Sequence, residues 1–214
     1  MGHFITFEGG EGAGKTSLIR LLSEKLQAHG QACIVTREPG GIPIAEQIRH
    51  VILDPVNTEM DSRTEALLYA AARRQHLAEK VLPALATDCF VLCDRFVDSS
   101  LVYQGYARGL GIEAVREINA FAIQEAMPKL TFLLDIDPVK GLGRITANKD
   151  REQNRLDMED LRFHELVYEG YRMIQASEPE RIKLINADRP LDVIAEEVLS
   201  IMQANIQTLA NINI

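Results

Sequence analysis

The 214-residue sequence has little of several features by which large classes of protein are recognised. It has no tryptophan, only three cysteines, and fewer lysines and arginines (23) than aspartates and glutamates (31). The formal net charge of −8 argues against a general nucleic-acid-binding protein, which favours a basic face. The odd, sparse cysteine count argues against a disulfide framework and indicates a reducing compartment, so we expect a cytoplasmic protein.

Long apolar runs are also absent. No stretch reaches the roughly 18 residues of a membrane-spanning helix, and the first residues lack the basic and apolar regions of a signal peptide. The opening residues do fit a myristoylation pattern. Phe4, Ile5 and Phe7 instead favour a buried first strand, so we expect neither a lipid anchor nor a membrane partner.

What the sequence does contain is an alternation of short apolar runs with helical patterns. The apolar runs are residues 3–9, 32–38, 89–96, 130–137 and 181–187, and the three cysteines lie in them as expected core residues. The helical patterns span Thr16–His29, Thr64–Ala86 with a break near Pro83, Ile112–Met127, Phe163–Gln175 and Leu191–Ala204. Continuous apolar strands are typical of a parallel sheet covered on both faces. The order predicts an α/β fold with a doubly wound, five-stranded parallel sheet flanked by helices.

Neither a repeat nor a linker divides the chain, so residues 1–214 are predicted to form a single domain. One segment, about 143–157, lacks apolar periodicity and carries Arg144, Lys149, Arg151 and Arg155. We expect this segment to be a small, mobile polar lid that is helical at most in part.

Residues 7–17, FEGGEGAGKTS, contain the phosphate-loop pattern G-x-x-x-x-G-K-[ST]. The pattern follows a predicted strand and opens a predicted helix, which is the context that makes it credible. Glycines let backbone N–H groups converge on phosphate oxygens, and the helix N-terminus adds its positive dipole end. We expect Lys15 to reach the β- and γ-phosphates of ATP and Thr16 to ligate Mg²⁺. The predicted nucleotide contacts of the loop are Gly9, Gly10, Glu11, Gly12, Ala13, Gly14, Lys15, Thr16 and Ser17.

Two other nucleotide-binding patterns fail. A dinucleotide fingerprint would need a third glycine where Lys15 stands, and a guanine motif N-K-x-D lacks its spacer at Asn148-Lys149-Asp150. Within the loop, Glu11 is unusual because its carboxylate would repel a polyphosphate. Its side chain either faces a sugar hydroxyl of a second substrate or points outward into solvent.

Three arginines stand close to the predicted strand ends. Arg37 and Arg95 follow the second and third strands, and Arg73 lies on the helix between them. Ligands of open α/β sheets bind outside the carboxyl ends of the strands, so arginines gathered there predict a site for a second phosphate. Each arginine taken alone could equally be a surface ion-pair partner.

Together, these motifs resemble the thymidylate kinases. Six segments fall in the family's order and spacing, from Phe4 to about Met202: FEGGEGAGKT, TREPGGIPIAEQIR, AAARRQH, DRFVDSSLVYQG, GLGR…NRLD and LINADRPLDVIAEEV. The block DRFVDSSLVYQG is the specific one, because other nucleoside monophosphate kinases share the loop without it. The resemblance implies the reaction ATP + dTMP → ADP + dTDP in dTTP biosynthesis, with Mg²⁺ as cofactor and a homodimeric enzyme.

The resemblance also implies roles for single residues. Arg73 and Arg95 match the arginines that hold the acceptor nucleotide, with Arg95 also catalytic, and Gln104 matches an amide on the pyrimidine edge. Tyr103 matches a ring that disfavours ribose, and Tyr69 stands where the family often has a Phe stacked on the base. The remaining implied contacts of dTMP are Glu11, Glu38, Pro39, Arg49, Ser99 and Ser100. Those of ATP are Arg144, Asn186, Ala187 and Asp188, and Asp94 is implied to support Mg²⁺ through water.

The family supplies its catalytic arginine either from the phosphate loop or from the lid. The loop position here is Gly12, so the resemblance implies the bacterial-type arrangement with Arg151 and Arg155 of the lid in catalysis. The lid departs from the family's D-R-[IV]-E, because residues 154–157 read NRLD, and the lid is longer than in relatives.

The chemistry implied here needs no general base. The acceptor is a phosphate monoester with a second pKa of about 6, so it is already mostly ionised at neutral pH. Catalysis would come from positioning and from neutralising two charged phosphates. Two alternatives stay open: a kinase of another nucleoside monophosphate or of a deoxynucleoside, and a nucleotide-dependent switch that hydrolyses ATP slowly. The switch would have little use for an acceptor pocket of Arg73, Arg95 and Gln104.

Overall fold

A computed structural model gives the fold of the protein and describes residues 2–147 and 155–209. Five strands form one parallel sheet in the order β2-β3-β1-β4-β5. The strands are β1 (His3–Glu8), β2 (Cys33–Arg37), β3 (Phe90–Asp94), β4 (Leu130–Asp135) and β5 (Ile182–Asn186). The predicted α/β fold with a five-stranded parallel sheet is therefore confirmed, strand by strand.

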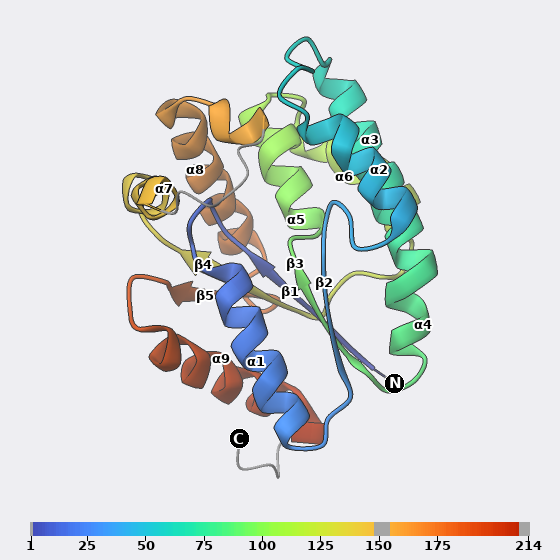
Figure 1. Ribbon diagram of the computed structural model, residues 1–214, viewed down its shortest axis with the longest axis vertical. Helices are drawn as coiled ribbons and strands as arrows, with labels where there is room; N and C mark the ends of the chain where they lie inside the picture. Colours follow the sequence, from blue (N-terminus) through green and yellow to red (C-terminus); the bar gives the residue numbers. More distant parts are fainter. Residues whose placement is uncertain (1, 148–154, 210–214) are drawn as a thin grey trace.

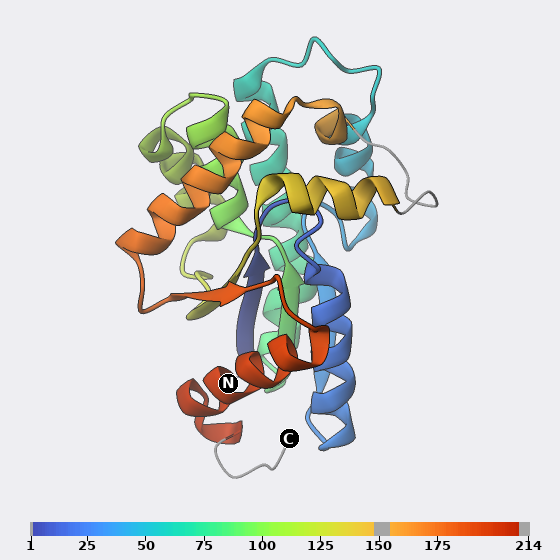
Figure 2. The ribbon, with the colours of Figure 1, turned by 90° about the vertical axis from the view of Figure 1, so that its left-hand side faces the viewer.

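Helices cover both faces of the sheet (Figures 1 and 2). On one face lie α1 (Lys15–Ala28) and α9 (Leu191–Asn205), which also contact each other. The other face carries α3 (Ser62–His76), α6 (Ile112–Ile123) and α8 (Leu161–Ser177). Because successive side chains of a strand point to opposite faces, each strand contributes to both layers.

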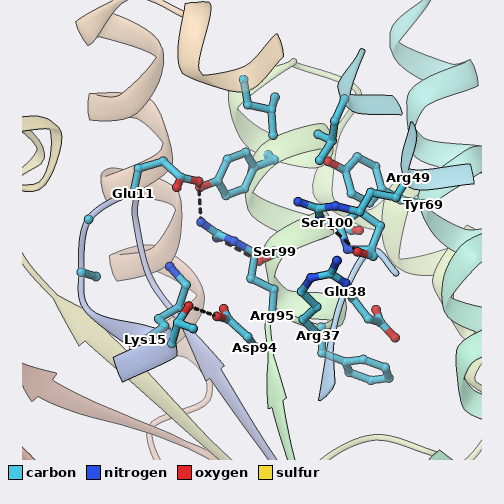
Figure 3. Close-up of a pocket in the computed structure, with 18 of the residues that line it drawn as sticks. Glu11, Lys15, Arg37, Glu38, Arg49, Tyr69, Asp94, Arg95, Ser99 and Ser100 are labelled. Atoms are coloured by element: carbon cyan, nitrogen blue, oxygen red, sulfur yellow. Dashed lines mark hydrogen bonds and ion pairs between the residues drawn. The ribbon is translucent and has the colours of Figure 1, made fainter. Parts of the chain in front are cut away.

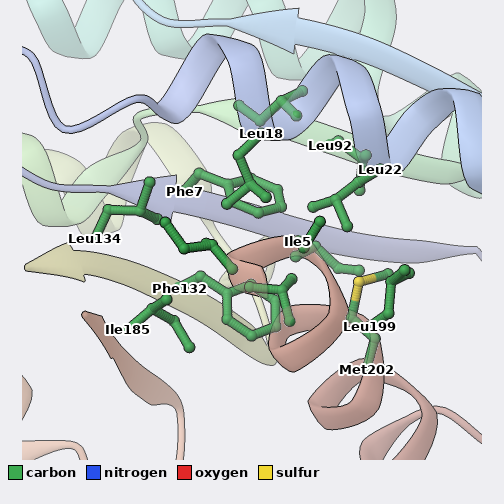
Figure 4. Packing of buried hydrophobic residues seen from close by; sticks show 14 of the residues in the cluster. Ile5, Phe7, Leu18, Leu22, Leu92, Phe132, Leu134, Ile185, Leu199 and Met202 are labelled. Carbon is green, nitrogen blue, oxygen red and sulfur yellow. The ribbon is translucent and has the colours of Figure 1, made fainter. Parts of the chain in front are cut away.

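The main core lies between the sheet and the helices α1 and α9. In β1, Ile5 and Phe7 pack there, and the Phe7 ring stacks on Phe132 with 5.5 Å between the centroids. Leu18 and Leu22 approach this layer from α1, as Figure 4 shows. Burial of this layer fixes the direction of β1, and so fixes where the loop after β1 emerges.

Three helical regions of ten residues or more were not predicted. They are α2 (Pro43–Leu53), α5 (Val97–Ser100) continued by the π-helix η2 (Leu101–Ala107), and α7 (Pro138–Ala147). Both α2 and α7 begin on a proline, Pro43 and Pro138. A proline in the first turn of a helix has no N–H to leave unpaired, so these two prolines were start signals that the sequence offered.

Two predicted helices have different bounds in the structure. The pattern at 64–86 is divided into α3, the π-helix η1 (Leu77–Val81) and α4 (Leu82–Leu85), so the break predicted near Pro83 lies just before it. A proline inside a helix clashes with the carbonyl four residues earlier, and a π turn relieves the clash. The helix predicted over 112–127 ends at Ile123, because Gln124 takes a left-handed φ of 51°.

Only part of the predicted lid falls on described residues. Residues 143–147 form the end of α7, and Arg155–Met158 form the short helix η3. Lys149 and Arg151 lie outside the described residues. The described chain ends with a further short helix, η4 (Gln207–Leu209).

All three cysteines are free thiols; Cys89 and Cys93 are buried, as predicted, whereas Cys33 is partly exposed. Within residues 2–147 and 155–209, no helix is long and apolar enough to cross a membrane.

Candidate active site

A cavity of about 600 Å³ opens at the carboxyl ends of the strands. In Figure 3, Glu11 and Lys15 lie on one side of this cavity, Arg49 and Tyr69 lie on the other, and Arg95 stands between them. The cavity joins the loop after β1 to helices α2 and α3 and to η2. The cavity therefore offers a phosphate-binding loop on one side and helix-borne arginine and tyrosine side chains on the other.

The phosphate loop turns directly from β1 into α1. Gly14 stands at the helix N-cap with φ 88°, a left-handed conformation that favours glycine, and α1 begins at Lys15. Lys15 is buried, and its Nζ donates to the carbonyls of Gly9 and Gly10, at 3.0 Å each. Burial, and next the nearby Arg95, lowers the pKa of Lys15 to about 8. The lysine is thus a cation held at low solvation inside the loop, ready to pair with an anion.

Gly12 lies where no side chain fits. Its φ is 69°, and a Cβ built there would meet the carbonyl oxygen of Gly141 in α7 at 2.0 Å. The contact is reciprocal, because a Cβ on Gly141 would lie 2.3 Å from the Glu11 carbonyl oxygen. The phosphate loop and α7 therefore touch backbone to backbone, which excludes an arginine at position 12 in this arrangement.

Two oxygen groups meet at the start of α1. The Thr16 hydroxyl donates to Asp94 Oδ2 at 2.8 Å, bringing a residue of the loop and the end of β3 together. No cluster of three or more His, Cys, Asp or Glu side chains that could hold a metal occurs in the described part of the chain. A Mg²⁺ ion, which keeps several waters and takes further oxygens from phosphates, fits such a sparse pair of protein ligands.

Arg95 occupies the centre of the cavity. Its φ is 68°, and its Nη2 donates to Glu11 Oε1 at 2.6 Å. Its Nη1 donates to the Gly9 carbonyl at 3.0 Å, and its guanidinium lies 5.1 Å from the Tyr103 ring centroid. The Tyr103 hydroxyl also donates to Glu11, at 3.4 Å. Glu11 therefore faces the cavity, and the reading in which it points outward into solvent is wrong.

A buried carboxyl behind Arg95 was missed by the sequence analysis. Glu8 Oε1 accepts from the Phe96 N–H at 2.7 Å, and Oε2 accepts from the hydroxyls of Ser99 at 2.6 Å and Tyr171 at 2.9 Å. Burial, and next the charge of Asp98, raises the pKa of Glu8 to about 7. The carboxyl fixes the start of α5, which carries Ser99 and Ser100 of the segment DRFVDSSLVYQG. A glutamate at the end of β1 is the only sequence signal that pointed to it.

Arg73 is held from every side by the protein. Its Nε donates to Glu38 Oε2 at 2.7 Å and its Nη2 donates to the Phe96 carbonyl at 3.0 Å. Its Nη1 donates to Ser100 Oγ at 3.1 Å and also to Asn119 Oδ1. Glu38 offsets the buried positive charge, so the guanidinium has one fixed position in the cavity wall.

Glu38 is itself held by a second partner. His76 Nδ1 lies 2.8 Å from Glu38 Oε1, and His76 Nε2 lies 2.7 Å from Thr36 Oγ1. Arg73 and His76 are three residues apart on α3 and so share a face of the helix. That spacing within AAARRQH was a signal for the pairing, although the acidic partner could not be chosen from it.

Two more arginines line the side of the cavity near α2. Arg37 makes a bidentate ion pair with Glu46, with N···O distances of 2.6 and 3.1 Å. This pair offsets much of the positive charge of Arg37. Arg49 donates to the Pro39 carbonyl at 3.1 Å. Burial, and next the positive charge of Arg37, lowers the pKa of Arg49. A half-buried guanidinium with that environment is suited to an anionic or carbonyl-rich ligand.

An aromatic ring lies on the side of the cavity opposite the loop, and an amide belongs to the same lining. Tyr69 and Gln104 both line the cavity, and burial raises the pKa of the Tyr69 hydroxyl, so the ring stays neutral. Gln104 donates from Nε2 to Glu65 Oε1 at 2.8 Å. Leu53 and Leu156 add apolar wall. A flat, partly polar ring fits these surroundings.

A family model described as thymidylate kinase matches residues 7–198. A thymidylate kinase of Oceanobacillus iheyensis is 61% identical over 203 residues, which are 95% of this chain and 90% of that protein. The chain belongs to the thymidylate kinase family. A second relative, the thymidylate kinase of Bacillus pumilus, is 62% identical over 202 residues, 94% of this chain and 95% of that protein. The resemblance drawn from the motifs is confirmed.

The fold agrees with a solved thymidylate kinase structure. The crystal structure of thymidylate kinase from Ehrlichia chaffeensis superposes with a TM-score of 0.77 at 30% identity, covering 95% of this chain and 100% of that one. The five-stranded sheet with its flanking helices is thus the nucleoside monophosphate kinase type that the sequence analysis expected.

Most residues that the phosphate-loop pattern predicted or the resemblance to thymidylate kinases implied line this one cavity, although their binding roles stay predictions. They are Glu11, Gly12, Ala13, Gly14, Lys15, Thr16, Ser17, Glu38, Pro39, Arg49, Tyr69, Arg73, Asp94, Arg95, Ser99, Ser100, Tyr103, Gln104 and Arg144. Gly9 and Gly10 instead hold Lys15 through their carbonyls.

The remaining predicted thymidylate kinase residues lie elsewhere. Asp188 pairs with Lys140 at 2.5 Å and with Arg144 at 3.3 Å, and the Ala187 carbonyl accepts from Arg144 at 3.3 Å. The segment 186–188, which the resemblance implies contacts ATP, is thus tied to α7 beside the cavity. Arg155 is buried, donates to the Ile52 carbonyl at 2.9 Å and pairs with Glu65. Arg151 lies outside the described residues.

Proposed function

We propose that this protein transfers the γ-phosphoryl group of ATP to dTMP, giving dTDP and ADP. Membership of the thymidylate kinase family makes it a phosphotransferase with dTMP as acceptor. The observation that supports the assignment of its site is one continuous cavity, lined also by Gln104, with Lys15 on one side, Tyr69 on the other and Arg95 between them. Such a cavity holds a nucleotide monophosphate with its phosphate toward the phosphate loop.

The donor side consists of the phosphate loop and the start of α1. We assign the β- and γ-phosphates of ATP to the loop N–H groups and Lys15, whose ammonium group would exchange the Gly9 and Gly10 carbonyls for phosphate oxygens. Thr16 and Asp94 would hold Mg²⁺, directly or through water. When bound, Mg²⁺ would neutralise charge on the phosphates.

The acceptor side consists of arginines and a carboxylate already held in place. Arg95 faces the centre of the cavity and would contact the dTMP phosphate, while Arg73 would support the same nucleotide from the wall. Glu11 would accept from a sugar hydroxyl, and the Tyr103 ring would limit space beside the sugar. Tyr69 would stack on the base, with Arg49 and Ser100 at the pocket wall.

No general base takes part in the proposed reaction. At neutral pH, the monoester of dTMP is mostly ionised, so an oxygen of its phosphate attacks the γ-phosphorus directly and the bond to the bridging oxygen of ADP breaks. The protein contributes by aligning the two phosphates and reducing their repulsion. Lys15 would offset charge on ATP, and Arg95 would offset charge on the dTMP phosphate. A lid that closes over the reactants would also exclude water.

The catalytic charge of the lid stays a proposal. The backbone contact between Gly12 and Gly141 leaves no room for a loop arginine, which supports a source elsewhere. Arg144 already lines the cavity, and Arg151 is the remaining candidate of the lid. Arg155, paired with Glu65, is better suited to holding the end of the lid than to contacting phosphate in this conformation.

We also propose a cytoplasmic homodimer that contacts neither nucleic acid nor membrane. The three free thiols support the reducing compartment. Leu67 on α3 is 56% exposed and Phe121 on α6 is 87% exposed, on helices that contact each other. An exposed Phe and Leu on adjacent helices support an apolar contact between two copies through this face.

The deciding experiment is a coupled ADP-release assay with a panel of acceptors. We expect dTMP to be preferred, dUMP to be weaker, and ribonucleotides to be poor because of the Tyr103 ring. Phosphorylation of UMP as good as that of dTMP would show that the pocket is assigned wrongly. A better rate with AMP, dGMP or dCMP would instead support the alternative of another nucleoside monophosphate kinase.

A further inference from the structure

Gln104 and Glu65 form a buried pair at the base end of the cavity. Both side chains are 1% exposed, and Gln104 Nε2 donates to Glu65 Oε1 at 2.8 Å. Gln104 lines the cavity from η2, whereas Glu65 stands behind it on α3. Glu65 was not among the residues that the sequence pointed to, and it does not line the cavity.

Two arginines make Glu65 an obligatory acceptor. Arg155 Nη2 pairs with Glu65 Oε2, and Arg108 Nε lies 3.7 Å from Oε1. A carboxylate paired with guanidinium groups accepts hydrogen bonds and donates none. Gln104 must therefore turn its NH₂ group toward Glu65, so its orientation follows from chemistry rather than from the similar shapes of the amide O and N.

The fixed NH₂ group decides what Gln104 shows to the cavity. The opposite pole of the amide is the carbonyl oxygen Oε1, and no hydrogen bond within the described part of the chain uses this oxygen. The cavity therefore presents an acceptor at this position and withholds the donor. A ligand with an N–H at that place is satisfied, and a ligand with a lone pair is repelled.

We propose that Glu65 is a specificity-positioning residue, which fixes Gln104 as an acceptor and so selects pyrimidines that carry an N3–H. Thymine and uracil donate from N3, whereas neutral cytosine has a lone pair there. The proposal rests on the function proposed above and on the place of Gln104 at the pyrimidine edge, which the resemblance to thymidylate kinases implies. It adds that the carboxylate behind the amide discriminates dTMP from dCMP without touching either.

The key variant is Glu65→Gln. The new amide can keep its oxygen toward Arg155 and turn its NH₂ group to Gln104, which would then accept and present its own NH₂ group to the base. We expect the ratio of kcat/KM for dTMP to that for dCMP to fall about tenfold or more. The dTMP to dUMP ratio should stay within about twofold, since both bases carry N3–H.

A matched control is Glu159→Gln. Glu159 pairs with the same Arg108, with 2.5 Å between Oε1 and Nη2. Because the control weakens the charge network without a bond to Gln104, we expect both selectivity ratios to stay near wild type. Damage to folding alone would lower all rates together and would leave the dTMP to dCMP ratio unchanged.

Glu65→Asp keeps the charge between the arginines but shortens the side chain, and it serves if Glu65→Gln does not fold. Because the Asp carboxylate would lie farther from Gln104, this variant should also lower the dTMP to dCMP ratio of kcat/KM. An unchanged ratio in whichever of these variants folds and turns over dTMP overturns the proposal. Failure of the proposed site is recognised separately: Gln104→Leu would then leave the same ratio unchanged, because Gln104 would not meet the base.

Discussion

At the scale of single residues, Lys15 is the side chain whose surroundings best suit the binding of a phosphate anion. Its ammonium group donates to two loop carbonyls and does not pack in the apolar core, so we expect it to contribute little to the stability of the fold. We expect Lys15→Ala to lower kcat by roughly 10²- to 10³-fold, the loss typical of one preorganised donor to a reacting anion. Steady-state kinetics and a thermal melt of the same sample test this, and a parallel loss of Tm would contradict it by indicating a structural role.

The lowered pKa of Lys15 also predicts a pH dependence. Its pKa of about 8 in the free enzyme means that the cation is lost as the pH rises above 8, well before an ordinary lysine at 10.5. Because dTMP is fully ionised by then, kcat/KM for ATP should fall above about pH 8 as Lys15 loses its charge. A profile from pH 6.5 to 9.5 measures the effect.

Lys15→Arg provides the comparison, because its guanidinium stays protonated over that range. The variant should be slower but should not show the decline above about pH 8. A flat wild-type profile to pH 9.5 would rule out the proposed role of the lysine charge in binding ATP.

At the scale of elements, the contact between the phosphate loop and α7 is the feature with the sharpest test. Gly141→Ala would put a Cβ 2.3 Å from the Glu11 carbonyl oxygen, so loop and helix must separate. A misplacement of about 1 Å can cost 10²-fold in rate, so we expect kcat/KM for ATP to fall by roughly that factor. Gly143→Ala on the same helix is the control, since nothing lies within 4 Å of its Cβ.

We expect the two lid arginines, Arg151 and Arg155, to differ in how their loss affects kcat and Tm. Arg151→Ala should lower kcat far more than it raises KM for dTMP, because its charge would act mainly in the transition state. Arg155→Ala should in addition lower Tm, since it leaves the buried carboxylate of Glu65 short of a partner, a loss that typically costs about 3–5 kcal/mol. Near-normal kcat in the double variant would show that the lid does not supply the catalytic charge.

At the scale of the whole molecule, the exposed ring of Phe121 predicts how two copies meet. We expect Phe121→Glu on α6 to shift a dimer toward monomer, because a charge would have to be buried in an apolar contact. Sedimentation velocity at several concentrations measures the shift. Val193→Glu is the control, since Val193 is also exposed but lies on α9 (Figure 1). A Phe121→Glu protein as dimeric as wild type would exclude this face.

The sequence by itself determined the sheet and the phosphate loop. Apolar runs without alternation specify strands buried on both faces, and the phosphate-loop glycines with Lys15 and Thr16 specify the anion site, because both signals are local. The placement of Arg37 and Arg95 after strands that meet at one edge of the sheet was local in the same way, whereas the role of Gln104 came only from the resemblance to thymidylate kinases. These predictions needed no knowledge of distant contacts.

Only the tertiary structure decided the partners of these residues. Glu65 behind Gln104, Glu8 behind Arg95 and Gly141 against Gly12 are pairs separated by tens of residues or more, and no spacing rule chooses among the chain's many carboxylates and glycines for them. Arg155 shows the same limit, because its buried partner Glu65 could not be chosen from the sequence, while its implied catalytic role stays a prediction. Local chemistry fixes which groups are present, whereas packing fixes which of them meet.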